Sequence, residues 1–128
     1  MSTVNWNSDA MKTANHFLNQ TYQMESTFSE RVNQLISANL KNPAFDVRAL
    51  AALLYISRIQ LFRKLKEETG KSPTTYIRGY RLERGKELLE TTDLLINQIA
   101  YEVGFKDPAH FSKAFKEWEG RSPKDVRK

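Results

Sequence analysis

From Phe28 onward, apolar residues recur every three or four positions, which is the spacing of amphipathic helices. We predict a first helix over residues 28–40, capped by Thr27 or Ser26 and ended by Asn42-Pro43. Nowhere is the alternation of a half-buried strand stronger than this helical spacing. The chain is therefore expected to be all-α.

Two shorter helices are predicted within residues 46–70. Asp46 and Ser57 suit their N-caps, because a short side-chain oxygen accepts a backbone N–H of the first turn. Gly70 suits the end of the second helix, because glycine adopts the left-handed conformation without strain. The apolar positions of this pair are Val47, Leu50, Ala51, Leu53, Leu54, Ile59, Leu61, Phe62 and Leu65.

A longer helix is predicted over residues 73–90. Ser72 is its expected cap, and Pro73 fits its first turn because proline lacks the N–H that would have no partner there. The polar run Thr91-Thr92-Asp93 is expected to end it. This helix would link the preceding pair of helices to whatever follows.

A second pair of short helices is predicted over about residues 95–120. Gly104 lies in the turn between them, where a positive φ is expected. Asp107 is the expected cap of the later helix, with Pro108 in its first turn and Gly120 at its end. Four of its residues are expected to face inward: Phe111, Ala114, Phe115 and Trp118.

The two pairs of helices repeat one pattern. Leu50-Ala51 recurs 49 residues later as Ile99-Ala100, and Gly70-Lys71-Ser72-Pro73 recurs 50 residues later as Gly120-Arg121-Ser122-Pro123. The second copy therefore holds one extra residue, near Gly104–Asp107. Two helix-turn-helix units joined by a longer helix are the expected architecture.

The positive charge of the chain is concentrated on the repeated part. The net charge is +5; residues 1–50 hold four basic and four acidic side chains, and residues 51–128 hold 16 basic and 11 acidic ones. A basic excess on one region favours a polyanionic partner, although a basic surface without a partner has the same composition. Together with the repeat, it predicts a chain that grips double-stranded DNA at two places.

Composition argues against several other classes of protein. The chain has no cysteine, which excludes disulfides and thiolate zinc sites and fits a reducing cytoplasm. No apolar stretch approaches the roughly 20 residues of a membrane span, and the N-terminus lacks a signal-peptide pattern. With two histidines and no glycine-rich phosphate loop, we expect no enzyme, metal or cofactor. Residues 1–26 are expected to be a tail or linker, poorly ordered or partly helical near Asp9–Gln20.

DNA reading by such units requires polar side chains on the outward face of the second helix. In the first unit the candidates for base contact are Arg58, Ile59, Gln60, Phe62 and Arg63. Arg63 is the strongest, because a guanidinium can pair with both O6 and N7 of guanine; a phosphate contact or a solvated arginine is the alternative. Phe62 is either a contact to a thymine methyl or a sugar, or a core residue.

In the second unit the candidates for base contact are Pro108, Ala109, His110, Ser112 and Lys113. This face begins with small residues that allow close approach to base edges, but it offers few bidentate readers, so weaker selectivity is expected. His110 is either a donor to a base or phosphate, or an ordinary exposed histidine. The candidates for phosphate contact are Lys64, Lys66, Lys71, Lys106, Lys116, Arg121 and Lys124.

The stretch from Phe45 to Arg127, about two-thirds of the chain, resembles the DNA-binding domain of the AraC/XylS family of bacterial transcription regulators. The matching residues are Leu50-Ala51, Ser57, Leu61, Lys66, Gly70-Lys71-Ser72-Pro73, Tyr76-Ile77, Arg81-Leu82, Leu88-Leu89, Ile99-Ala100, Gly104-Phe105, Asp107, Phe111, Ala114-Phe115-Lys116 and Gly120-Arg121-Ser122-Pro123. The resemblance implies a seven-helix domain over residues 27–128, whose two recognition helices enter adjacent major-groove segments on one face of the DNA. It also implies contact with RNA polymerase, in the bacterial cytoplasm and on the nucleoid.

Two residues depart from the family pattern. Tyr55 stands where the first unit often has glycine, and a more tightly packed turn is expected there. Gly85 stands where the family usually has alanine; glycine in a helix costs about 1 kcal/mol relative to alanine, and we expect it to let another helix approach closely. The usual sensing domain is not in this chain, which either works alone or serves as the output domain of a larger regulator. Residues 28–45 resemble the lead-in of regulators in which this domain follows a receiver domain.

Two other functions remain open on the sequence alone. A nonspecific architectural DNA-binding protein would show no sequence preference, whereas the difference between the two recognition faces favours a directional site. An all-helical protein-interaction module would not bind duplex DNA even at low salt.

Overall fold

The structure is a computed structural model that describes residues 27–128. Within that range it contains seven helices and no strand. They are α2 (Phe28–Ala38), α3 (Val47–Leu53), α4 (Arg58–Thr69), α5 (Pro73–Thr91), α6 (Ile96–Glu102), α7 (Pro108–Glu119) and α8 (Pro123–Arg127). The all-α prediction is confirmed. The tail predicted over residues 1–26 lies outside the described residues.

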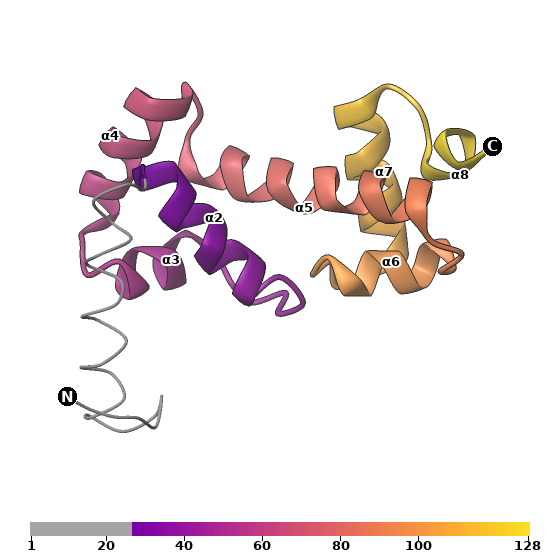
Figure 1. Cartoon of the computed structure of the whole chain (residues 1–128), viewed down its shortest axis with the longest axis horizontal. Helices are drawn as coiled ribbons and strands as arrows, with labels where there is room; N and C mark the ends of the chain where they lie inside the picture. The colour runs from indigo at the N-terminus through magenta and orange to yellow at the C-terminus, as the bar shows by residue number, and fades with distance from the viewer. Residues whose placement is uncertain (1–26) are drawn as a thin grey trace.

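The long helix α5 joins two groups of helices (Figure 1). α2, α3 and α4 lie around its beginning, and α6, α7 and α8 lie around its end. We call these groups the first unit (residues 27–72) and the second unit (residues 92–128). The first helix stops at Ala38 rather than at residue 40, because Asn39 turns back on it: its N–H donates to Ile36 O and its Nδ2 donates to Leu35 O.

Side-chain caps begin the helices where the sequence predicts them. Thr27, not Ser26, caps α2: its Oγ1 accepts from Glu30 N–H at 3.1 Å, while its own N–H donates to the Glu30 carboxylate at 2.9 Å. Asp46, Ser57, Ser72, Asp107 and Ser122 likewise accept a backbone N–H of the first turn. Gly70 and Gly120 end α4 and α7 with φ values of 78° and 92°, the left-handed conformation that glycine favours.

The buried apolar side chains form two cores, one in each unit. The first contains Val32, Ile36, Phe45, Leu50, Ala51, Leu61, Leu65 and Ile77. The second contains Leu82, Leu89, Ile99, Ala100, Val103, Phe105, Phe111, Ala114 and Phe115. α5 contributes to both cores, and the half-buried Leu40 packs against both. Two small cores on one helix therefore replace a single central core.

Gly85 lies where α5 and α7 approach each other, as expected from its departure from the family pattern. A Cβ at this position would lie 2.9 Å from Phe111 Cε1. That distance is shorter than carbon atoms accept, so the ring of Phe111 occupies the space that an alanine side chain would need. The close approach predicted for this residue is confirmed.

The turns of the two units have the same hydrogen bonds. In the first unit Ile56 N–H donates to Ala51 O, and in the second Phe105 N–H donates to Ala100 O, 49 residues later. Tyr55 adopts a φ of 58° in this turn, as Gly104 does with a φ of 86°. Our expectation of a more tightly packed turn at Tyr55 is wrong: the residue is 94% exposed, so its side chain adds no packing to the turn.

Trp118 is also less buried than its spacing predicts. Its ring packs against Phe115 with 5.7 Å between ring centroids, yet 40% of the residue remains exposed. Trp118 lies in the last turn of α7, beyond Phe115, which is the last buried residue of that helix. Phe111, Ala114 and Phe115 are buried as predicted.

Candidate nucleic-acid interface

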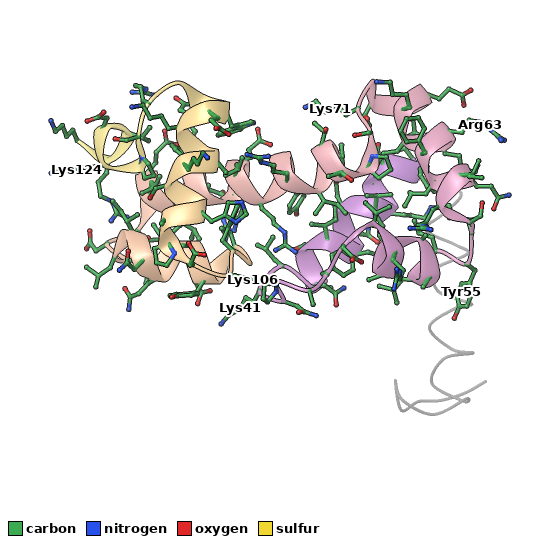
Figure 2. The ribbon with its side chains drawn as sticks, turned by 180° about the vertical axis from the view of Figure 1, so that it is seen from behind. Lys41, Tyr55, Arg63, Lys71, Lys106 and Lys124 are labelled. Carbon is green, nitrogen blue, oxygen red and sulfur yellow. The ribbon has the colours of Figure 1, made fainter. Side chains whose placement is uncertain are left out.

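The outward face of α4 is set by its buried stripe. Leu61 and Leu65 are fully buried in the first core, and Arg63 lies on the opposite side of the helix. The five predicted base-contact residues of this helix are all exposed: Arg58, Ile59, Gln60, Phe62 and Arg63. Figure 2 shows Arg63 extending away from the rest of the first unit. α4 therefore presents an exposed face of polar and apolar side chains, which Val47 of α3 and Pro73 and Thr74 of α5 border on one side.

Two apolar side chains on this face are exposed. Ile59 is 73% exposed and Phe62 is 50% exposed. Phe62 is therefore not one of the residues of the first core, and its contact with DNA stays a prediction. With Arg63, Lys66 and Glu67, these residues line a shallow groove of about 390 Å³ along α4.

Gln60 is held by the helix start. Its Oε1 accepts a hydrogen bond from Ser57 N–H at 2.9 Å, while its own N–H donates to Ser57 Oγ at 3.0 Å. A bidentate contact of glutamine with adenine uses both the amide oxygen and the amide nitrogen. Such a contact by Gln60 would require this cap to open, whereas Arg63 takes no part in it.

α7 has the same organisation in the second unit. Its buried stripe is Phe111, Ala114 and Phe115, and Lys113 lies opposite it, 50 residues after Arg63. The predicted base-contact residues Ala109, His110 and Lys113 are exposed, and Pro108 and Ser112 are half-buried. The ring of His110 meets Phe105 edge-on at 5.3 Å between centroids, which restricts its orientation.

Two of the predicted phosphate contacts, Lys64 and Arg121, interact with other side chains of this chain, and the rest form no ion pair within residues 27–128. Lys64 Nζ lies 5.4 Å from the centre of the Phe28 ring, on the side of α4 that faces α2. Arg121 Nη2 lies 2.7 Å from Glu119 Oε2, and Lys86 contacts the other oxygen of the same carboxylate. The other five predicted phosphate contacts are exposed lysines that take part in no ion pair within the described part of the chain: Lys66, Lys71, Lys106, Lys116 and Lys124. Lys66 belongs to α4 and Lys116 to α7, and Figure 2 shows that Lys71, Lys106 and Lys124 lie well apart along the molecule.

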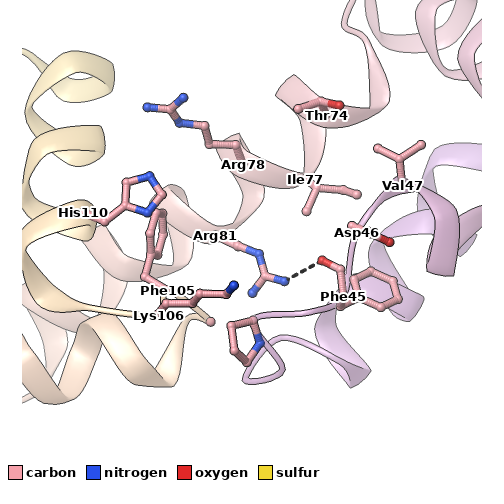
Figure 3. A pocket seen from close by; sticks show the side chains of 12 residues that line it. Phe45, Asp46, Val47, Thr74, Ile77, Arg78, Arg81, Phe105, Lys106 and His110 are labelled. Carbon is pink, nitrogen blue, oxygen red and sulfur yellow. Dashed lines mark hydrogen bonds between the residues drawn. The ribbon is translucent and has the colours of Figure 1, made fainter.

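A cavity of about 430 Å³ lies between the two units (Figure 3). Four basic side chains reach it: Arg78 and Arg81 from α5, Lys106 from the loop before α7, and His110 from α7. Its other lining residues are Pro43, Phe45, Asp46, Val47, Thr74, Ile77, Gly104 and Phe105. Neither Arg78 nor Arg81 was predicted from the sequence to contact DNA. Their position beside the cavity could have been predicted from the sequence, because the helical spacing of Thr74, Ile77, Arg78 and Arg81 places all four on one side of α5.

Arg81 is the one buried charged residue within the described residues, at 6% exposure. Burial lowers the pKa of its guanidinium from the ordinary value.

The described residues contain no cluster of His, Cys, Asp or Glu that would hold a metal ion. None of the described helices is long and apolar enough to span a bilayer.

Comparison with known proteins identifies the arrangement. A family model described as a helix-turn-helix domain matches residues 50–128. Histidine kinase P4 of Formosa agariphila is 41% identical over 90 residues, which cover 70% of this chain and 7% of that protein. The curated relatives are much longer than the matched region: the chain spans between 7% and 36% of their lengths.

Two solved structures share the fold and the arrangement of helices. The C-terminal domain of AraT, a response regulator from Geobacillus stearothermophilus, is 33% identical with a TM-score of 0.72; the match covers 80% of this chain and 84% of that one. The DNA-binding domain of AdpA, a global transcriptional factor solved in complex with a target DNA, is 31% identical with a TM-score of 0.70; the match covers 76% of this chain and 86% of that one. Since the family model also matches more than half of the residues, the chain belongs to the AraC/XylS family of transcription regulators and carries its helix-turn-helix DNA-binding domain.

Proposed function

We propose that residues 27–128 bind double-stranded DNA in a sequence-specific manner with α4 and α7 in two adjacent major-groove segments. One observation carries this proposal. Arg63 and Lys113 occupy the same place on two helices that have matching caps, buried stripes and glycine ends. α5 holds both helices in one molecule (Figure 1), so a single chain presents two reading faces.

The two faces differ, which favours a directional site over nonspecific binding. α4 offers a guanidinium at Arg63, flanked by the exposed apolar side chains of Ile59 and Phe62. α7 offers an ammonium at Lys113 and an imidazole at His110, with the small Ala109 between the latter and the helix start. We expect stronger base selectivity under α4, because arginine recognises guanine through two hydrogen bonds at once. The unpaired lysines are proposed to contact phosphates.

The proposed partners extend beyond DNA. AraT is named as a response regulator and the Formosa protein as a histidine kinase, and both contain a region similar to this chain. We propose that the chain acts with a sensing or receiver domain as its input and with RNA polymerase as its target. It would do so by binding and not by catalysis, on the nucleoid in the bacterial cytoplasm.

Selection of bound duplexes from a random pool, followed by footprinting on the selected site, tests the proposal. We expect one asymmetric site whose two protected major-groove segments lie about one helical turn, or about 34 Å, apart. Duplexes recovered without any shared sequence would instead support an architectural DNA-binding protein. Failure to bind duplex DNA at low salt would support a protein-interaction module.

A further inference from the structure

The junction between the two units is built around one arginine. Arg81 lies in the middle of α5, and its guanidinium donates to four backbone carbonyls. Nη1 donates to Leu40 O and to Val103 O at 2.8 Å; Nη2 donates to Asn42 O and to Phe45 O, both at 3.1 Å. No carboxylate pairs with this residue within the described part of the chain.

The four carbonyls come from both units. Leu40, Asn42 and Phe45 belong to the loop between α2 and α3, and the Phe45 side chain is buried in the first core. Val103 closes α6 and is buried in the second core. The guanidinium is planar and its donors point in fixed directions, so it satisfies all four carbonyls only when the two units hold one relative orientation.

The backbone of the second unit packs very closely against Arg81 at Gly104. A Cβ at position 104 would lie 1.6 Å from Arg81 Nη1 and 2.2 Å from Leu40 O. The equivalent residue of the first unit, Tyr55, carries a full side chain in the same backbone conformation. The turn of the second unit therefore packs directly against Arg81 and the first unit's loop, while the turn of the first unit faces solvent.

The other contacts across the junction are weaker. Leu40 packs against both cores but is only half-buried. Lys41 and Glu102 form an ion pair at 3.2 Å with side chains 72% and 43% exposed, and exposed pairs of this kind contribute little. Without Arg81, the relative orientation of the units would depend mainly on the stiffness of α5, and long helices bend.

We propose that Arg81 is a positioning residue that fixes the spacing and rotation between the two recognition helices, and that it thereby makes the chain selective for the distance between the two halves of its DNA site. This inference rests on the proposed function. Adding one base pair between two half-sites moves the second by about 3.4 Å and rotates it by about 35°. A rigid junction holds the two recognition helices at one spacing, so only one of them can then meet its half-site. A flexible junction lets both helices bind at the altered spacing.

The first experiment measures the junction without DNA. Because the chain has no cysteine, spin labels can be attached to cysteines introduced at the exposed residues Arg48 of α3 and Asn97 of α6. We expect a narrow distribution of label-to-label distances in the labelled chain and a clearly broader one after Arg81→Met, with the helix content retained. Arg81→Lys keeps the charge without the fork of donors and should broaden the distribution too.

Arg127→Met is the matched control. Arg127 also donates to four carbonyls, those of Leu88, Leu89, Thr92 and Leu94, but all of them belong to the end of α5 and the loop after it. This variant should lose stability and keep the narrow distance distribution. If it broadened the distribution as much as Arg81→Met does, the effect would be general destabilisation and the proposal would be wrong.

The second experiment measures DNA affinity on duplexes whose half-sites are moved apart or together by one base pair. The unsubstituted chain should lose about tenfold in affinity at either altered spacing. In the Arg81→Met and Arg81→Lys variants this loss should fall to about threefold or less, while Arg127→Met keeps the tenfold preference.

Several results would overturn the proposal. The first is a broad distance distribution in the unsubstituted labelled chain. The second is an Arg81→Lys variant with an unchanged distance distribution and an unchanged spacing preference. The third is loss of folding of both units in both Arg81 variants. The last result would assign Arg81 to the cores and not to the junction. If the unsubstituted chain bound no duplex, the proposed function would fail, but the distance measurements would still decide the role of Arg81.

Discussion

Gly85 of α5 and Phe111 of α7 share a contact that leaves no room for a methyl group: a Cβ on residue 85 would lie 2.9 Å from Phe111 Cε1. We predict that Gly85→Ala destabilises the chain by about 1 kcal/mol net, because a steric cost of about 1–3 kcal/mol exceeds the gain in helix propensity of about 1 kcal/mol. Chemical unfolding of the two proteins measures the difference.

Gly79→Ala in the same helix is the control. No atom outside the local backbone lies within 4 Å of a Cβ at that position, so the substitution should stabilise the chain by about 0.5–1 kcal/mol. Equal stabilisation by both substitutions would show that the ring of Phe111 moves aside without cost.

Tyr55 and Gly104 make a second matched pair. Both have a positive φ, which strains any residue but glycine. Tyr55→Gly should stabilise the chain by about 0.5–1 kcal/mol, because relief of the strain exceeds the entropy cost of glycine and the exposed ring loses little packing. Thermal unfolding monitored by circular dichroism is a sufficient measurement.

Gly104→Ala should have the opposite effect. The new methyl group would overlap Arg81 Nη1 and Leu40 O, and we expect a loss of about 2–4 kcal/mol. A Tyr55→Gly variant less stable than the unsubstituted chain would mean that the exposed ring makes contacts that the described residues do not account for.

Arg63 and Leu61 should separate recognition from folding. Arg63→Ala is expected to change stability by less than about 0.5 kcal/mol, because the side chain faces solvent. It should weaken specific binding by about 1–3 kcal/mol and relax the preference at one base pair. Leu61→Ala, at a fully buried position, should instead destabilise the fold by about 2–5 kcal/mol. Affinity on matched and mismatched duplexes, with unfolding curves for both variants, decides the matter. An equal loss of affinity on all duplexes after Arg63→Ala would make Arg63 a phosphate contact.

DNA affinity should fall steeply as salt is added, because the excess positive charge lies on residues 51–128. The slope of log affinity against log salt is expected to be about −0.9 for each phosphate contacted. Lys66→Ala should reduce the magnitude of that slope by about 1 and leave the base preference unchanged. A flat salt profile for the unsubstituted chain would contradict the electrostatic interpretation.

Glu119 should make stability depend on acidity. Its carboxylate lies 2.7 Å from Arg121 and 3.2 Å from Lys86, and these contacts lower its pKa in the folded chain. In acid the unfolded chain therefore takes up a proton at Glu119 before the folded chain does, so stability rises with pH. The contribution is complete above the ordinary pKa of 4.5 and is lost as the pH falls through the lower folded value.

Glu119→Gln tests this dependence. The difference in free energy of unfolding between the original chain and this variant should shrink as the pH is lowered from neutrality to below 4.5. Glu117→Gln is the control, because its ion pair with Arg78 is exposed and should contribute little at any pH. A difference for Glu119→Gln that stays constant over the titration would show that the ion pairs do not stabilise the fold.

Local rules predicted most of the fold. Asp46 and Ser57 cap helices because a short oxygen beside a helix start meets free N–H groups whatever lies further away. Gly70 ends a helix for an equally local reason. The sequence also placed Arg63 correctly on the outside, since its spacing from Leu61 and Leu65 alone decides that.

What the sequence did not predict depends on contacts between distant residues. Arg81 looks like an ordinary charged residue of a helix, and only the folded chain brings carbonyls from residues 40 and 103 to its guanidinium. The exposure of Tyr55 and of Trp118 likewise depends on where the cores end, and the periodicity of a single helix does not contain that information. The cap formed by Ser57 and Gln60 could be predicted from their spacing of three residues. The same Gln60 side chain was also predicted to contact a base, and the hydrogen bonds of the cap compete with that contact.

The division of the apolar side chains into two cores, described above, determines how the molecule opens. We expect each core to open to water while the other stays intact, at a lower free energy than complete unfolding. The backbone amides of Ile36 and Leu61 should then exchange with solvent deuterium at rates set by opening of the first unit, and those of Ile99 and Phe111 at rates set by the second. If a substitution in one core changes exchange rates in the other, the size of that change measures the coupling free energy between the two cores, which are connected through α5 and Arg81.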